Sequence, residues 1–166
     1  MKLEEAKLKF IQTWGALGSN WGISKTMAQV HALLMISKEP LSAEEIMETL
    51  NISRGNTNMT VRSLIDWGLV YREIKTGDRR EFFRGEKDIY LVGKQIVKIR
   101  REREVQPVIQ LLNSLQDIDE KNAETVEFKQ QMQEIADFTK RSDSLVAKLV
   151  EADENWFGKM LMKLMK

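Results

Sequence analysis

One stretch of the sequence combines side chains that can recognise nucleic-acid bases. On a helical wheel at about 100° per residue, the segment 53–67 separates a core-facing side from a polar side. The core-facing positions are Thr57, Val61, Leu64, Ile65 and Gly68, the outward ones are Gly55, Asn56, Met59, Arg62 and Ser63, and Asn58 and Thr60 lie on the flanks. Arginine can donate to guanine O6 and N7, and asparagine can pair with adenine N6 and N7. The candidate base-reading side chains are therefore Arg54, Asn56, Asn58 and Arg62.

Contacts to DNA outside the base edges could come from the start of this helix and from the hairpin turn that follows it. Ser53, Thr60 and the free amides at the helix start suit phosphate oxygens. A turn follows at 75–79, and Gly77 permits it because glycine accepts a positive φ. The cations of this turn are Lys75, Arg79 and Arg80. An arginine on a thin hairpin can enter a narrow, electronegative minor groove, and Asp78 could orient one of these arginines through an ion pair.

Helices and strands must position these side chains, and the sequence carries clear start and stop signals for them. We expect helices over 3–18, 24–36, 42–50, 53–67 and 122–150, and a further helix from 89 that Pro107 kinks or restarts. Ser42 and Glu45 form a capping box, and Ser24 and Ser53 are expected N-caps. Two short strands are expected at 69–74 and 81–84. The order of helix, short turn, helix and hairpin predicts a winged helix-turn-helix.

The charge is distributed unevenly, although the net charge is only +1. Residues 1–50 carry 5 basic and 6 acidic side chains, residues 51–104 carry 13 and 8, and residues 105–166 carry 8 and 11. The local field rather than the total charge determines attraction to a polyanion, because salt screens charges beyond about 10 Å. The basic segment is the one with the base-reading face, so the near-neutral total does not exclude DNA binding.

Composition excludes several other kinds of chemistry. The chain has no Cys and one His, which rules out thiolate and multi-histidine metal centres and makes triad catalysis improbable. We therefore expect no enzyme activity, no metal site and no cofactor. With no transmembrane segment and no secretory signal in the sequence, we expect a cytoplasmic protein. The segment 155–166 is amphipathic, and we favour its docking in a dimer over binding a membrane surface.

Five runs of the sequence resemble a known family. They are Trp-Gly-Ile-Ser at 21–24, Glu-Pro-Leu-Ser-Ala-Glu-Glu-Ile at 39–46, Asn-Ile-Ser-Arg-Gly-Asn at 51–56, Trp-Gly-Leu-Val at 67–70 and Gly-Asp-Arg-Arg at 77–80. Together they are similar to the GbsR-type branch of the MarR-like transcriptional regulators, over about residues 10–110. The resemblance implies a homodimeric repressor or activator, recognition by the helix at 53–67, and wing contacts from Arg79 and Arg80. The tail after about residue 115 departs from this pattern.

Apolar stripes in the terminal helices suggest a second subunit. Helices within 1–18 and 105–166 have longer stripes than one winged domain can cover, so we expect them to pair two copies of the chain. Trp14, Trp21 and Trp67 leave two interpretations open. Core packing is favoured, but aromatic faces can also hold a quaternary ammonium ion, and some regulators of the resembled branch respond to osmoprotectants of that kind.

These observations combine into one prediction. The fold is mainly α with a small β-hairpin wing. Residues 1–20 contribute to dimerisation, 21–88 form the DNA-binding domain, and 89–166 form a helical dimerisation region. The predicted function is that of a sequence-specific transcriptional regulator, a ligand-responsive repressor that binds a pseudo-palindromic operator as a homodimer. The alternative is a winged-helix adaptor that binds another protein through the same face.

Overall fold

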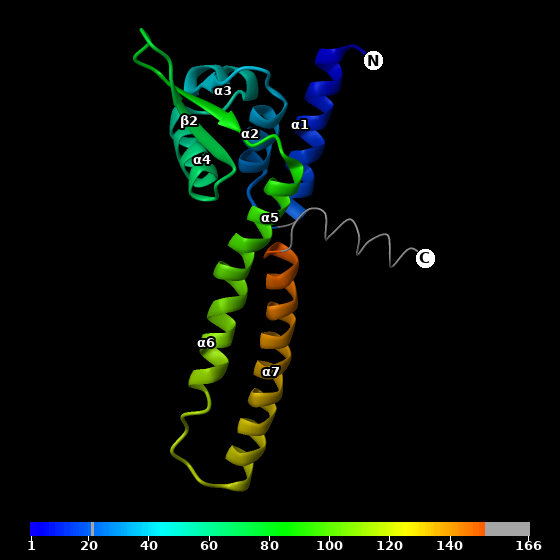
Figure 1. Ribbon diagram of the computed structural model, residues 1–166, viewed down its shortest axis with the longest axis vertical. Helices are drawn as coiled ribbons and strands as arrows, with labels where there is room; N and C mark the ends of the chain where they lie inside the picture. Colours follow the sequence, from blue (N-terminus) through cyan, green and yellow to red (C-terminus); the bar gives the residue numbers. More distant parts are fainter. Residues whose placement is uncertain (21, 152–166) are drawn as a thin grey trace. The chain divides into compact units, whose positions relative to one another are not determined.

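A computed structural model describes residues 1–20 and 22–151 (Figure 1). The chain divides into two compact units, Met1–Gln95 and Ile96–Lys166. Trp21 and the amphipathic segment 155–166 lie outside the described residues, so the expected docking of that segment stays a prediction. No described helix is both long and apolar enough to cross a membrane.

The first unit begins with helices whose starts the sequence encodes. The order is α1 (Leu3–Asn20), α2 (Lys25–Ile36), α3 (Ala43–Leu50) and α4 (Arg54–Asp66). Ser24, Ser42 and Ser53 are N-caps, and each accepts a hydrogen bond from the backbone N–H three residues on. At Ser42 the Glu45 carboxylate also accepts from the Ser42 backbone N–H, which completes the predicted capping box. The expected helix starts are thus confirmed.

A small antiparallel sheet closes the first unit. The strands are β1 (Leu41–Ser42), β2 (Val70–Ile74) and β3 (Glu81–Gly85), in the order β1-β3-β2. The hairpin of β2 and β3, which we call the wing, pairs Val70 with Gly85 and Ile74 with Glu81. Gly77 in its turn has the positive φ of 85° that was expected. Strand β1, which pairs Leu41 with Phe83, was not among the strands expected from the sequence.

The core of this unit lies under α4 and the sheet. Val30 and Leu34 of α2, Ile46 of α3, Leu64 of α4 and Val70 of β2 are all almost fully buried. At the end of β3, a Cβ on Gly85 would come within 2.8 Å of the Leu34 backbone, so the sheet approaches α2 closely because this residue is glycine. The buried face of α4 is therefore anchored from two sides, and its other face is left exposed.

The second unit consists mainly of a helical hairpin. The boundary between the units lies within α5 (Ile89–Arg100), which leads into a π-helical turn, η1 (Arg101–Val105). The helices α6 (Gln106–Ser114) and α7 (Ala123–Glu151) then lie side by side. Pro107 is in the first turn of α6, where its missing N–H costs nothing, so the expected restart of the helix is confirmed. Asp143 of α7 accepts hydrogen bonds from Arg101 at 2.6 and 2.9 Å and from Gln106 at 3.0 Å.

Candidate nucleic-acid interface

Helix α4 has one buried and one exposed face. Thr57, Thr60, Val61 and Leu64 are at most 4% exposed. Arg54, Gly55, Asn58, Met59 and Arg62 are exposed on the other side, and Asn56 and Ser63 are half-buried. The wheel analysis was thus correct for Thr57, Val61 and Leu64. The exposed face carries polar and small side chains with one large apolar residue, Met59.

Arg62 and Asn58 are free to bind a ligand. Among residues 1–20 and 22–151, neither side chain has a hydrogen bond or an ion pair to another group. A ligand therefore displaces only water from them. Arg54 differs, because its guanidinium lies 3.5 Å from Glu44, with both side chains well exposed. Such a pair contributes little and competes weakly with a phosphate or a base.

Thr60 does not lie on the surface where we expected a phosphate contact. It is 4% exposed, and its hydroxyl donates to Asn56 Oδ1 at 3.3 Å. The wheel placed Thr60 on a flank, but packing against the rest of the unit covers that flank. Thr60 therefore orients the Asn56 amide from within the protein and is not a direct contact. Ser53 is exposed, although its hydroxyl oxygen is engaged by the Asn56 backbone N–H at 3.3 Å.

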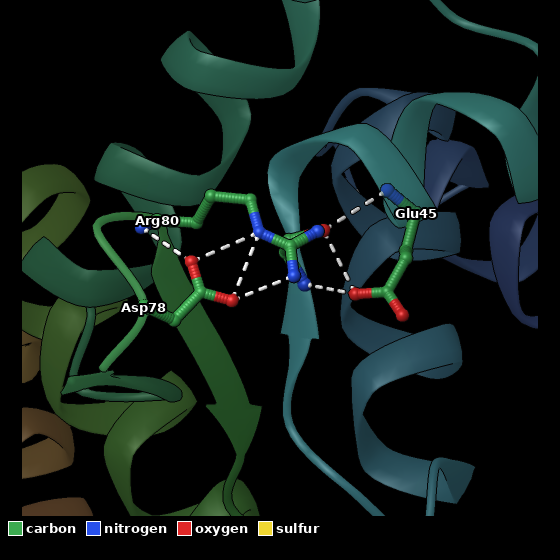
Figure 2. A network of polar contacts seen from close by, with 4 residues as sticks. Glu45, Asp78 and Arg80 are labelled. Atoms are coloured by element: carbon green, nitrogen blue, oxygen red, sulfur yellow. Dashed lines mark hydrogen bonds and ion pairs between the residues drawn. The ribbon is translucent and has the colours of Figure 1, made fainter. Parts of the chain in front are cut away.

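The tip of the wing holds one arginine rigidly. Asp78 accepts from Arg80 through the backbone N–H at 2.9 Å, through Nε at 3.1 Å and through Nη2 at 2.7 Å (Figure 2). These hydrogen bonds lower the pKa of Asp78 to about 2 and raise the pKa of Arg80. The Phe82 ring lies 5.2 Å from the same guanidinium and 4.0 Å from Lys75 Nζ. The expectation that Asp78 orients a wing arginine is confirmed, and that arginine is Arg80.

Arg79, by contrast, is fully available. It is exposed, and the described part of the chain offers it no hydrogen bond or ion pair. The wing thus presents one arginine whose direction is fixed by Asp78 and one that can adapt.

The wing tip also acts electrostatically on the start of α3. Hydrogen bonds from the Ser42 backbone and hydroxyl lower the pKa of Glu45, and the positive charges of Arg80 and Lys75 lower it further. Figure 2 shows Glu45 facing the Arg80 side of the wing. The Glu45 carboxylate is thus held ionised within the capping box, which keeps α3 and the turn before α4 in place.

A polar pocket of about 260 Å³ separates α4 from the wing. Its lining residues are Asn58, Val61, Arg62, Ile65, Arg72, Glu81 and Phe83. The sequence analysis did not select Arg72, whose guanidinium lies 2.9 Å from Glu81. The alternation of strand β2 was the available signal, because it places Arg72 on the same side of the sheet as buried Val70. Two arginines therefore border the space between the two elements.

The tryptophans that could form an effector site lie in different parts of the fold. The Trp14 ring lies 5.5 Å from Phe10 and 6.4 Å from His31, between α1 and α2. Trp67 is 8% exposed, at the end of α4. Trp21 lies outside the described residues. Within residues 1–20 and 22–151 there is also no cluster of three metal-binding side chains.

Residues 21–81 match the model of the MarR family. The match covers less than half of the chain, within the part that folds as a winged helix-turn-helix. The match runs from four residues before α2 to the first residue of β3, so it contains α4 and the turn of the wing. The part of the chain that carries the exposed polar face is thus similar to the MarR family.

Named relatives agree with this result. The chain is 22% identical over 88 residues to the Bacillus subtilis protein named "Putative HTH-type transcriptional regulator YvaV". The matched region covers 53% of this chain and 50% of that one. It is 27% identical over 107 residues to the HTH-type transcriptional regulator MmpR5 of Mycobacterium tuberculosis, with 64% of each chain covered. The chain thus spans between half and two thirds of the length of these relatives. A crystal structure of a transcriptional regulator shares the fold, with a TM-score of 0.67, 19% identity, and coverage of 87% of this chain and 95% of that one.

Proposed function

We propose that this protein binds duplex DNA sequence-specifically and regulates transcription. In this arrangement α4 enters the major groove, and the wing reaches the adjacent minor groove. The observation that carries the proposal is the exposed face of α4, where Arg62 and Asn58 have no partner among the described residues, beside a wing with an oriented arginine. The MarR-family match and the named regulators support the same function.

Roles for the individual side chains follow from this placement. Arg62, Asn58, Asn56 and Arg54 read base edges, and Ser53 with the first amides of α4 contacts a phosphate. Arg80 enters the minor groove, and Lys75 and Arg79 contact the backbone nearby. Gly55 allows close approach of the DNA.

Assembly and regulation form the second part of the proposal. Two copies pair through helices of 1–20 and 89–166, so that two α4 helices read a pseudo-palindromic site with half-sites about 10 base pairs apart. The protein acts in the cytoplasm as a repressor of the GbsR-type branch. Its effector is a small molecule, and a quaternary ammonium compound suits an aromatic site that includes Trp14, Trp21 or Trp67.

A gel-shift titration with genomic fragments tests the central part. We expect the full chain to bind at low salt, and the affinity to fall steeply between roughly 50 and 200 mM salt as counterions are released. Arg62→Ala should weaken binding, whereas Lys121→Ala, a matched charge change on an exposed side chain between α6 and α7, should not. If the full chain binds no duplex at low salt, the α4 face serves a protein partner instead.

A further inference from the structure

The exposed face of α4 contains an apolar position within its polar surroundings. Met59 is 65% exposed. Its neighbours one turn away are Gly55 and Asn56 on one side and Arg62 and Ser63 on the other. Side chains on a helix lean toward its N-terminus, so the Met59 side chain points toward the turn that contains Gly55, without coming within 4 Å of where a Cβ on Gly55 would lie.

Gly55 leaves open space on the same exposed face. A Cβ added to Gly55 would meet no atom within 4 Å, and the backbone there has no positive φ. Neither packing nor conformation therefore requires glycine at this position in the first turn of α4, and in helix interiors glycine is about 1 kcal/mol less favourable than alanine. What remains is close approach by a ligand to the bare backbone.

We infer that Met59 and Gly55 together receive the C5-methyl group of a thymine. The inference rests on the proposed DNA binding and adds a specificity residue to it. The thymine methyl is the apolar feature that distinguishes bases in the major groove. The flexible, polarisable methionine side chain adapts well to such a group. Gly55 provides the depth that lets the methyl group lie against the helix, and Met59 covers it.

Removal of the methyl group alone provides the test. A duplex that the full chain selects from a random library is amplified once with dTTP and once with dUTP, so that thymine and uracil probes differ only at C5. We expect the wild-type chain to bind the uracil probe about fourfold more weakly for each methyl group in contact. Single dT→dU replacements should localise the loss to one position in each half-site.

Two variants separate Met59 from effects of DNA shape. Met59→Gln keeps the length of the side chain but makes it polar, and it should bind thymine and uracil probes almost equally. Met59→Leu should retain most of the preference. Because Met59 is largely exposed, both variants should keep the wild-type melting temperature.

Three results overturn the inference. Equal binding of both probes by the wild type shows that no methyl group is contacted, while the proposed DNA binding stands. A full thymine preference in Met59→Gln places the reading elsewhere on the protein. Failure to select any duplex removes this inference together with the proposed function.

Discussion

At the scale of the residue, the candidate interface combines free and restrained cations. Arg62 has no partner among the described residues. Arg80, by contrast, donates to the Asp78 carboxylate from three atoms: its backbone N, Nε and Nη2. A free arginine can adapt to a base edge. A restrained one loses less conformational entropy on binding, but it must share its charge with Asp78. We therefore expect Arg62 and Arg80 to affect DNA binding in different ways.

Replacement of Asp78 by Asn tests this difference. Asp78→Asn removes one negative charge from the wing tip and releases Arg80. We expect stronger binding to DNA of any sequence, with a steeper salt dependence, and a smaller preference for A/T-rich flanks because Arg80 is no longer directed. Fluorescence anisotropy with two duplexes that differ only in their flanks measures both. An unchanged preference would show that the ion pair does not orient Arg80 on DNA.

Gly55 provides a prediction that separates stability from binding. Gly55→Ala should raise the free energy of unfolding by as much as about 1 kcal/mol, because alanine is the better helix former and the added Cβ meets open space. The same methyl group should weaken DNA binding by obstructing close approach. Thermal unfolding and anisotropy of one preparation report the two effects. Unchanged affinity would contradict the role of Gly55 at the interface.

At the scale of the element, N-caps and apolar spacing were sufficient to predict most of the fold. Ser24, Ser42 and Ser53 marked three helix starts because their hydroxyls satisfy backbone N–H groups within the same segment. Strand β1 could not be predicted in this way. It has only two residues, and its extended form depends on pairing with β3, far away in the sequence.

The parts of the candidate site that depend on local sequence could also be predicted, whereas those that depend on tertiary packing could not. Exposure of Arg62 and Asn58 followed from the helical period, and the link between Asp78 and Arg80 followed from their proximity in the turn. Burial of Thr60 depends on tertiary packing, which a helical wheel does not contain. Arg72 was missed because its place beside α4 depends on the pairing of the wing strands.

The contact between α1 and α2 should respond to acid. His31 is 3% exposed beside Trp14, its Nε2 has no hydrogen-bond partner among the described residues, and burial lowers its pKa from 6.5 to about 4. The unfolded chain therefore binds a proton between pH 6.5 and 4 that the folded chain does not. Stability is full above pH 6.5 and falls by up to about 3 kcal/mol as the pH drops to 4.

The variant His31→Leu isolates this contribution. It removes the titrating group, so the difference in unfolding free energy between pH 7 and pH 4.5 should become smaller than in the wild type. Urea unfolding at the two pH values measures it. Carboxylates also titrate in this range, and the comparison of the two proteins cancels their effect. Identical pH dependence would show that folding does not lower the pKa of His31.

In the whole molecule, the two compact units carry different features. The first contains the MarR-family match and, with α4 and the wing, most of the basic segment 51–104. The second contains a helical hairpin in which Asp143 accepts hydrogen bonds from Arg101 and Gln106. The hydrogen bond from Arg101 is the main cause that lowers the pKa of Asp143. We proposed that helices of this unit pair two copies. The spacing of the two α4 helices would then depend on this hairpin.

Asp143→Ala should weaken the second unit. It leaves the Arg101 guanidinium without its carboxylate and removes the acceptor for Gln106. Because both side chains are partly covered, we expect a loss of about 1–3 kcal/mol in stability. Asp137→Ala, on the same helix, is the control. Circular dichroism during thermal unfolding shows the loss, and light scattering shows whether assembly fails with it.

The most direct test of the account is the set of DNA sequences that the protein selects. The full chain and Arg62→Ala are each used to select duplexes from a random library. We predict that the wild type enriches a pseudo-palindrome with half-sites about 10 base pairs apart. Arg62→Ala should lose preference at one position in each half-site, at a cost of about 1–3 kcal/mol. A wild-type selection with no enrichment over the input library would contradict sequence-specific DNA binding by α4.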